Sequence, residues 1–194
     1  GLAKNIIKNG ITTTGLDLSD ERMNAFVEMR GTPAGSVAEL GTNSDAVFVM
    51  VMNGIQAKAV ILGDDGLVAH MPKGGAVILT ATIKPSEARY IGTALEGSGI
   101  HLIDSPVSGG FPGAQAGALT MMAAATSEVL DQYKPIMDAV SKTIHRVGTQ
   151  AGDGQVMKSC LQTLIGSIFG ATFEAAALAA KAGVSGQALY LSLI

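Results

Sequence analysis

Short apolar runs with strand character alternate with helical segments from the start of the chain to about residue 148. The runs at 46–52 and 76–80 are continuously apolar, which is typical of central strands in a parallel sheet with both faces covered. Other segments of this alternation are strands at 11–18 and 100–103 and helices at 19–29, 36–41, 54–62 and 85–97. The pattern predicts an α/β fold with a doubly wound sheet of the Rossmann type.

The rhythm changes after Ser105, where Gly109 to Gly113 predicts a glycine-rich loop. A strand at 118–124, a helix at 127–140 and a strand at 143–147 follow. These elements would extend the same sheet, which can then include antiparallel members.

Three glycines in 148–154 have the composition of a hinge. A helical pattern from about Gln155 to Lys181 comes next, and a further helix is predicted at 185–193. We therefore expect two domains. Residues 1–148 form the nucleotide-binding domain, and 149–194 form a long interdomain helix and the start of an all-helical domain.

The two ends of the chain are expected to be incomplete relative to such a fold. A doubly wound sheet opens with a strand and a glycine turn, whereas this chain begins within the predicted helix after that turn. The apolar stretch Leu164–Ala180 contains Glu174 and several small or hydroxyl residues. It predicts a buried helix rather than a membrane span.

Charge and cysteine content limit the classes of partner. The chain has 13 Lys and Arg against 16 Asp and Glu, a net charge of −3, and no basic run, so a nucleic acid or a membrane surface is not expected as a partner. The single Cys160 excludes an internal disulfide and a cysteine metal cluster, and we expect no metal site and a cytoplasmic location.

Asp17 follows the first predicted strand, where dinucleotide-binding folds place an acid that accepts hydrogen bonds from the adenosine ribose. A carboxylate there repels a 2′-phosphate, so it favours NAD over NADP. The alternative is a strand-end Asp that starts a turn. Arg22 could answer a 2′-phosphate, but its position also suits a solvated helix residue.

Two further segments follow predicted strands at the edge where ligands bind in open α/β sheets. They are Met52-Asn53-Gly54 and Thr80-Ala81-Thr82. Their side chains would suit loops over a pyrophosphate and a nicotinamide ribose, although each could also be an ordinary turn.

The segment Asp104–Gly110 carries a more specific pattern. Ser108 supplies a hydroxyl, and Gly109 and Gly110 let backbone N–H groups approach an anion closely. We expect this turn to hold a substrate carboxylate. A purely structural glycine turn is the alternative.

Lys158 lies in the first turns of the long predicted helix, with Gln162 four residues later on the same face. A lysine near a helix N-terminus that is partly desolvated has a lowered pKa, which suits proton transfer. An exposed lysine with its stem along the surface is the alternative. Apolar neighbours such as Val156, Met157 and Leu164 favour burial.

The remaining reactive side chains predict structural roles. His70, His101 and His145 have no ligand or triad spacing, and Cys160 is expected to be an inert, packed thiol.

Together these features resemble the β-hydroxyacid dehydrogenase family, which includes 3-hydroxyisobutyrate dehydrogenase, L-threonate dehydrogenase, tartronate semialdehyde reductase and 6-phosphogluconate dehydrogenase. Leu2–Ile6 is similar to the helix after that family's glycine turn, and Asp104–Gly110 is similar to its substrate motif. Gly154–Gln162 is similar to its catalytic helix, although Leu161 stands where the family usually has Asn or His.

The resemblance implies that Lys158 is the general acid/base at the C3 hydroxyl of a small β-hydroxy acid. It implies that the family's roles in substrate binding fall on Ser108, Gly109, Gly110 and Gln162. It also implies that NAD contacts Asp17, Met52, Asn53 and Thr82. The acid would lie in a cleft between the sheet domain and the long helix.

Other functions stay open at this stage. A tartronate semialdehyde or glyoxylate-type reductase that uses NADPH is one alternative, and a non-catalytic dinucleotide-binding module is another. In a third, the helices form an interaction platform and Lys158 is a surface residue. Members of the family usually form dimers or tetramers through the helical domain, and the apolar helix from Leu161 to Ala180 needs further cover. The resemblance therefore predicts a homodimer or homotetramer.

Overall fold

The computed structural model describes residues 1–193, with side chains through residue 192. It contains two compact units, one spanning Gly1–Lys158 and one beginning at Ser159. Each unit is described by itself. The predicted domain boundary at residue 148 stays a prediction.

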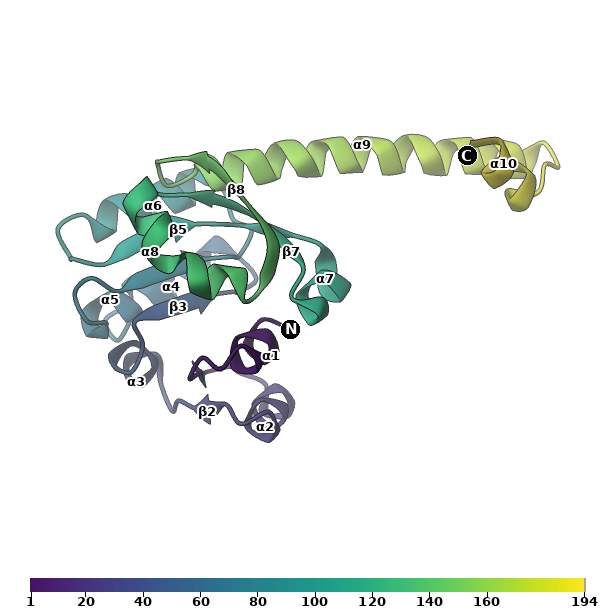
Figure 1. Ribbon diagram of the computed structural model, residues 1–194. Helices are drawn as coiled ribbons and strands as arrows, with labels where there is room; N and C mark the ends of the chain where they lie inside the picture. Colours follow the sequence, from purple (N-terminus) through teal and green to yellow (C-terminus); the bar gives the residue numbers. More distant parts are fainter. Residues whose placement is uncertain (194) are drawn as a thin grey trace. The chain divides into compact units, whose positions relative to one another are not determined.

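The first unit is built around a sheet with the strand order β3-β4-β5-β7-β6, in which β8 pairs with β7 (Figure 1). Strands β3, β4 and β5 are parallel, whereas β7 runs antiparallel to β5 and β6 and parallel to β8. A separate parallel pair is formed by β1 and β2. The strands are β1 (Thr14–Gly15), β2 (Thr32–Pro33), β3 (Ala46–Val49), β4 (Ala76–Leu79), β5 (His101–Asp104), β6 (Val107–Ser108), β7 (Leu119–Ala124) and β8 (Ser141–Gly148).

Helices cover both faces of this sheet. Along β4, Val77 and Leu79 pack with residues of α4 and α6, while Ala76 and Ile78 pack with residues of α1 and α8. All four strand residues are fully buried. This confirms the doubly wound architecture. The helices of the first unit are α1 (Leu2–Lys8), α2 (Asp20–Glu28), α3 (Val37–Thr42), α4 (Gly54–Leu62), α5 (Leu67–His70), α6 (Pro85–Leu95), α7 (Gly110–Ala116) and α8 (Ser127–Asp138).

Local signals explain most of the helix starts. Ser19, Ser36, Asn53 and Thr126 each accept a hydrogen bond from a backbone N–H in the first turn of the helix that follows. Such N-caps satisfy donors that have no partner within the helix. The predicted helices at these positions are confirmed.

Some predicted strand boundaries were wrong. The strand expected at 11–18 is reduced to β1, and the one expected at 46–52 ends at Val49. The apolar character of Met50 to Met52 does not mark a strand, because Met50 and Met52 are 59% and 85% exposed.

The second unit contains the larger part of α9 (Asp153–Lys181) and α10 (Gly186–Leu193). The prediction of a buried helix over Leu164–Ala180 was wrong for this chain, because nearly all of that stretch is exposed. By length and composition α9 could cross a membrane, because an 18-residue window of it has a mean hydropathy of 1.5 and none of that window is buried; one such helix is weak evidence for a membrane span.

Candidate active site

Three of the candidate segments leave the main sheet at the same end of its parallel strands. In the parallel register Val49 lies beside Leu79, and Leu79 lies beside Asp104. The segments that carry Asn53 and Thr82 therefore leave the sheet at the same edge, as does the segment after β5. Open α/β sheets bind ligands along such an edge.

Asp17 lies two residues after β1 and is partly exposed. Its Oδ1 accepts the backbone N–H of Ser19 at 2.9 Å, and its Oδ2 lies 3.4 Å from Nη1 of Arg22. The carboxylate thus begins a turn, which was the structural alternative to a ribose contact, and it is also open to a ligand. Arg22 is a solvated helix residue, with 76% of its side chain exposed.

Asn53 is the N-cap of α4. Its Oδ1 accepts the backbone N–H of Gln56 at 2.9 Å, and Gln56 Oε1 accepts the N–H of Met52 at 2.9 Å. These reciprocal bonds hold the loop rigidly at the start of the helix. Met52 projects into solvent beside it and is 85% exposed.

Thr82 is exposed, and the residues on either side of it are bonded to one side chain, that of Gln155. Its Oε1 accepts the N–H of Ile83 at 3.0 Å, and its Nε2 donates to the carbonyl oxygen of Ala81 at 3.1 Å. Sequence reasoning assigned no role to Gln155. The available signal was a polar residue directly after Gly154 at the start of an apolar helix.

Ser108 ends the short strand β6 and pairs with Thr120 of β7. Gly109 and Gly110 have φ angles of +123° and +58°, which L side chains rarely adopt. The prediction of a loop over Gly109–Gly113 was wrong, because α7 begins at Gly110. Positive φ values occur at both ends of that helix, since its C-cap Gly117 has a φ of +65°, and Pro112 is compatible with a first helical turn.

Lys158 is buried, with 8% of its surface exposed, and this desolvation lowers its pKa from the ordinary value. The burial of Lys158 does not come from the apolar neighbours that were predicted to cause it, because Val156 and Met157 are more than 40% exposed. Instead, Gly154 allows the start of α9 to pack directly against the backbone at the end of β5. A Cβ at that position would lie 2.5 Å from the carbonyl oxygen of Asp104.

Asp104 is a second residue that sequence reasoning left without a role. It is fully buried, and its Oδ2 accepts the backbone N–H groups of Gly152 at 2.8 Å and of Gln155 at 3.3 Å. Burial raises its pKa, while the hydrogen bonds oppose that shift. A carboxylate at the end of an apolar strand was the available signal.

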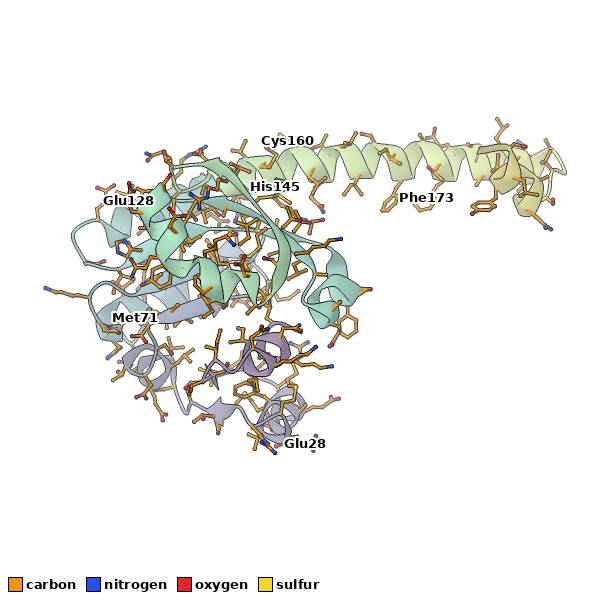
Figure 2. All side chains as sticks on the ribbon, in the orientation of Figure 1. Glu28, Met71, Glu128, His145, Cys160 and Phe173 are labelled. Carbon is orange, nitrogen blue, oxygen red and sulfur yellow. The ribbon has the colours of Figure 1, made fainter. Side chains whose placement is uncertain are left out.

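Gln162 and the proposed cleft both involve the second unit. Gln162 is exposed and belongs to the unit that begins at Ser159, so its part in substrate binding stays a prediction. The proposed cleft stays a prediction for the same reason. Cys160 is exposed, so the expectation of a packed thiol was wrong (Figure 2).

The fold and this edge of the sheet match a known family. The model of the NAD-binding domain of 6-phosphogluconate dehydrogenase matches residues 1–148. The chain belongs to this family. The expected resemblance to β-hydroxyacid dehydrogenases is thereby confirmed, and the segments from Asp17 to Gly110 lie within the matched residues.

Relatives of this family member are named as dehydrogenases of small hydroxy acids. The chain is 35% identical to an L-threonate dehydrogenase of Cupriavidus necator, over 98% of this chain and 64% of that one. It is 32% identical to a 3-hydroxyisobutyrate dehydrogenase of Pseudomonas aeruginosa, over 94% and 61%. The chain thus spans less than two thirds of the length of these curated relatives.

A solved structure has the same fold over the matched part. A 3-hydroxyisobutyrate dehydrogenase from Salmonella typhimurium superposes with a TM-score of 0.88 at 32% identity, and the match covers 97% of this chain and 66% of that one. The agreement extends over nearly all of this family member.

Proposed function

We propose that the protein is an oxidoreductase that transfers hydride between NAD and the C3 hydroxyl of a small β-hydroxy acid. The observation that carries the proposal is Lys158, a buried lysine with a lowered pKa, one helical turn after Gly154, which packs against the backbone at the end of β5. A lysine so placed can exchange a proton near neutral pH more readily than an exposed one.

The chemistry of these segments fits a dinucleotide. Asp17, after the separate strand β1, offers carboxylate oxygens to a ribose, and the segments with Asn53 and Thr82 follow strands β3 and β4 of the main sheet. Asp17 would repel a 2′-phosphate, which favours NAD. Arg22, 3.4 Å from that carboxylate, is the observation that favours the second candidate, an NADPH-dependent reductase of a semialdehyde.

The substrate class follows from the turn at Ser108–Gly110 and from the names of the relatives. A hydroxyl and backbone N–H groups at this turn can hold a carboxylate. The relatives are named for L-threonate and 3-hydroxyisobutyrate, which are small hydroxy acids. Leu161, three residues after Lys158 in α9, stands where the family usually has a polar residue, so we expect a substrate with an apolar or short group there.

The chemistry assigned to this chain is the movement of one proton. NAD, when bound, supplies the acceptor for the hydride that leaves the substrate carbon. Lys158 in its amine form takes the proton of the hydroxyl as the carbonyl forms, and its ammonium returns that proton in the reduction direction. A positioned acid/base of this kind contributes about 10²–10⁴-fold to the rate.

The test is the variant Lys158→Ala, compared with Lys134→Ala, which removes an exposed lysine paired with Asp138 on α8. We expect Lys158→Ala to keep its affinity for NAD, measured by titration, and to lose turnover by about 10²-fold or more. Lys134→Ala should resemble the wild type. Unchanged turnover in Lys158→Ala contradicts the proposal.

A substrate panel separates the candidates. Initial rates with L-threonate, 3-hydroxyisobutyrate and tartronate semialdehyde, each with both nicotinamide cofactors, should be highest for a hydroxy acid with NAD. Cofactor binding without any turnover of the panel would instead favour the non-catalytic module.

We also propose that the protein is a homodimer or homotetramer in the cytoplasm. Large apolar side chains on the second unit are exposed, among them Leu164, Phe169 and Phe173, and the two phenylalanine rings stack at 5.9 Å (Figure 2). Such a surface needs cover. Light scattering of the protein in solution tests this, and a monomer at micromolar concentration contradicts it.

A further inference from the structure

We propose that Gln155 is a positioning residue that joins the loop carrying Thr82 to the helix turn carrying Lys158, with Asp104 as its anchor. The inference rests on the proposed function, in which Thr82 lies beside the cofactor and Lys158 moves the proton. It adds a mechanical link between these two parts of the site.

Both the oxygen and the nitrogen of the Gln155 side-chain amide make hydrogen bonds. Its Oε1 accepts from Ile83 N–H at 3.0 Å, and its Nε2 donates both to Ala81 O at 3.1 Å and to Asp104 Oδ1 at 2.8 Å. The residue is fully buried. An amide that donates on one side and accepts on the other satisfies this set of partners, and neither a carboxylate nor an apolar chain of the same length does.

Asp104 holds the start of α9 through the same group of bonds. Its two oxygens accept from Gly152 N–H, Gln155 N–H and the Gln155 side chain. Gly152 has a φ of +97°, and Gly154 has no room for a Cβ against the carbonyl oxygens of Asp104 and Met122. The start of the helix is therefore attached to the strand ends through backbone and buried polar groups.

The distance from this attachment to Lys158 is short. Lys158 lies three residues after Gln155 in α9, less than one helical turn, so its Cα is about 5 Å further along the axis. A shift of the first turn moves Lys158 by a similar amount. On the other side, Ala81 and Ile83 flank Thr82, so a shift of Gln155 also moves the loop assigned to the cofactor.

The variant Gln155→Met tests the link, because it keeps the length of the side chain and removes the amide. Tyr133→Phe is the matched control, since it removes a part-buried hydrogen bond from a buried side chain to Gly74 O at the opposite ends of the strands. Both variants are compared at a temperature where unfolding curves show them fully folded. A deuterated hydroxy acid reports on the hydride step in single turnovers at saturating NAD and substrate.

We expect Gln155→Met to slow hydride transfer by about 10²-fold, as misplacement of a reacting group does, with a smaller change in KM. Tyr133→Phe should keep the wild-type rate. A wild-type rate in folded Gln155→Met overturns the proposal, because a residue with a purely structural role would lower stability alone.

Amide hydrogen exchange tests the link without any turnover. The N–H groups of Ile83 and Gly152 are protected by Gln155 and Asp104, so in ligand-free wild type they should exchange with the same free energy of opening. Gln155→Met should speed both together. Independent opening of the two amides in the wild type overturns the link, even if the variant does not fold. A wild type without turnover, but with joint opening, contradicts only the proposed function.

Discussion

Asn5 donates its side-chain amide to the carbonyl oxygen of Ala114 at 2.8 Å, which joins α1 to α7 across 109 positions of sequence. The same Nδ2 donates to Gly1 O at 3.0 Å, and only 6% of the Asn5 surface is exposed. Helix α7 begins directly after the turn at Ser108. The helix that opens the chain therefore supports the helix that follows the predicted carboxylate-binding turn.

Asn5→Ala should lower the free energy of unfolding by about 1–3 kcal/mol, because it removes the two part-buried hydrogen bonds from a buried side chain to the carbonyl groups of Gly1 and Ala114. Chemical denaturation measures the change. Asn43→Ala is the control, since Asn43 donates to Glu39 O at an exposed position and its loss should cost about 0.5 kcal/mol or less. Equal effects of the two variants would contradict the role of Asn5.

Ser105→Ala should leave stability unchanged or raise it. Ser105 is fully buried, and within the described residues its Oγ has no hydrogen-bond partner, so the hydroxyl carries a desolvation cost without a bond. Thr80→Val is the comparison, because Thr80 Oγ1 donates to Val49 O at 3.1 Å in an equally buried place. Thermal unfolding should show a loss for Thr80→Val only, and a clear loss for Ser105→Ala would refute the prediction.

Two glycines of α9 should respond in opposite directions to Ala. At Gly154 the new Cβ would meet Asp104 O and Met122 O at 2.5 and 2.7 Å, so we expect a loss of about 1–3 kcal/mol and reduced turnover. At Gly166 nothing lies within 4 Å, and Ala should stabilise the helix by up to about 1 kcal/mol. Denaturation of both variants checks this, and a neutral Gly154→Ala would contradict the close packing.

The pH dependence of stability should report on Lys158. Burial lowers its pKa below the ordinary value of 10.5 in the folded chain. Between these two pKa values the unfolded chain binds a proton that the folded chain does not, so the free energy of unfolding rises with pH across that window. Lys158→Met should flatten this rise. Denaturation at a series of pH values below 10.5 measures it, and an unchanged slope in the variant would be the contrary result.

The same titration should appear in catalysis. In the oxidation direction Lys158 acts as an amine base, so the rate should increase with pH up to its lowered pKa. Lys158→Arg, which stays protonated, should remove that dependence together with most of the activity. If the rate of Lys158→Arg rises with pH in the same way as that of the wild type, Lys158 is not the base.

The long-range contacts of the site were beyond sequence reasoning for a physical reason. Asp104 and Gln155 are 51 positions apart, and each alone is an ordinary polar residue in an apolar segment. Their pairing depends on how α9 leaves β8 and returns to the end of β5. The burial of Lys158 was predicted, but from apolar neighbours that are in fact exposed, whereas the close approach at Gly154 is what places the helix.

The sequence by itself determined the alternation of the longer strands and helices, the apolar strands β3 and β4, and the motifs at Ser108 and Lys158, because apolar periodicity, N-caps and residue spacing are local properties of a chain. It did not indicate the short elements β2, β6, α5 and α7. Only the tertiary structure decided that Gly110 starts a helix, that Cys160 is exposed and that Gln155 bridges two segments. These outcomes depend on which surfaces meet, and that is set by packing between residues distant in sequence.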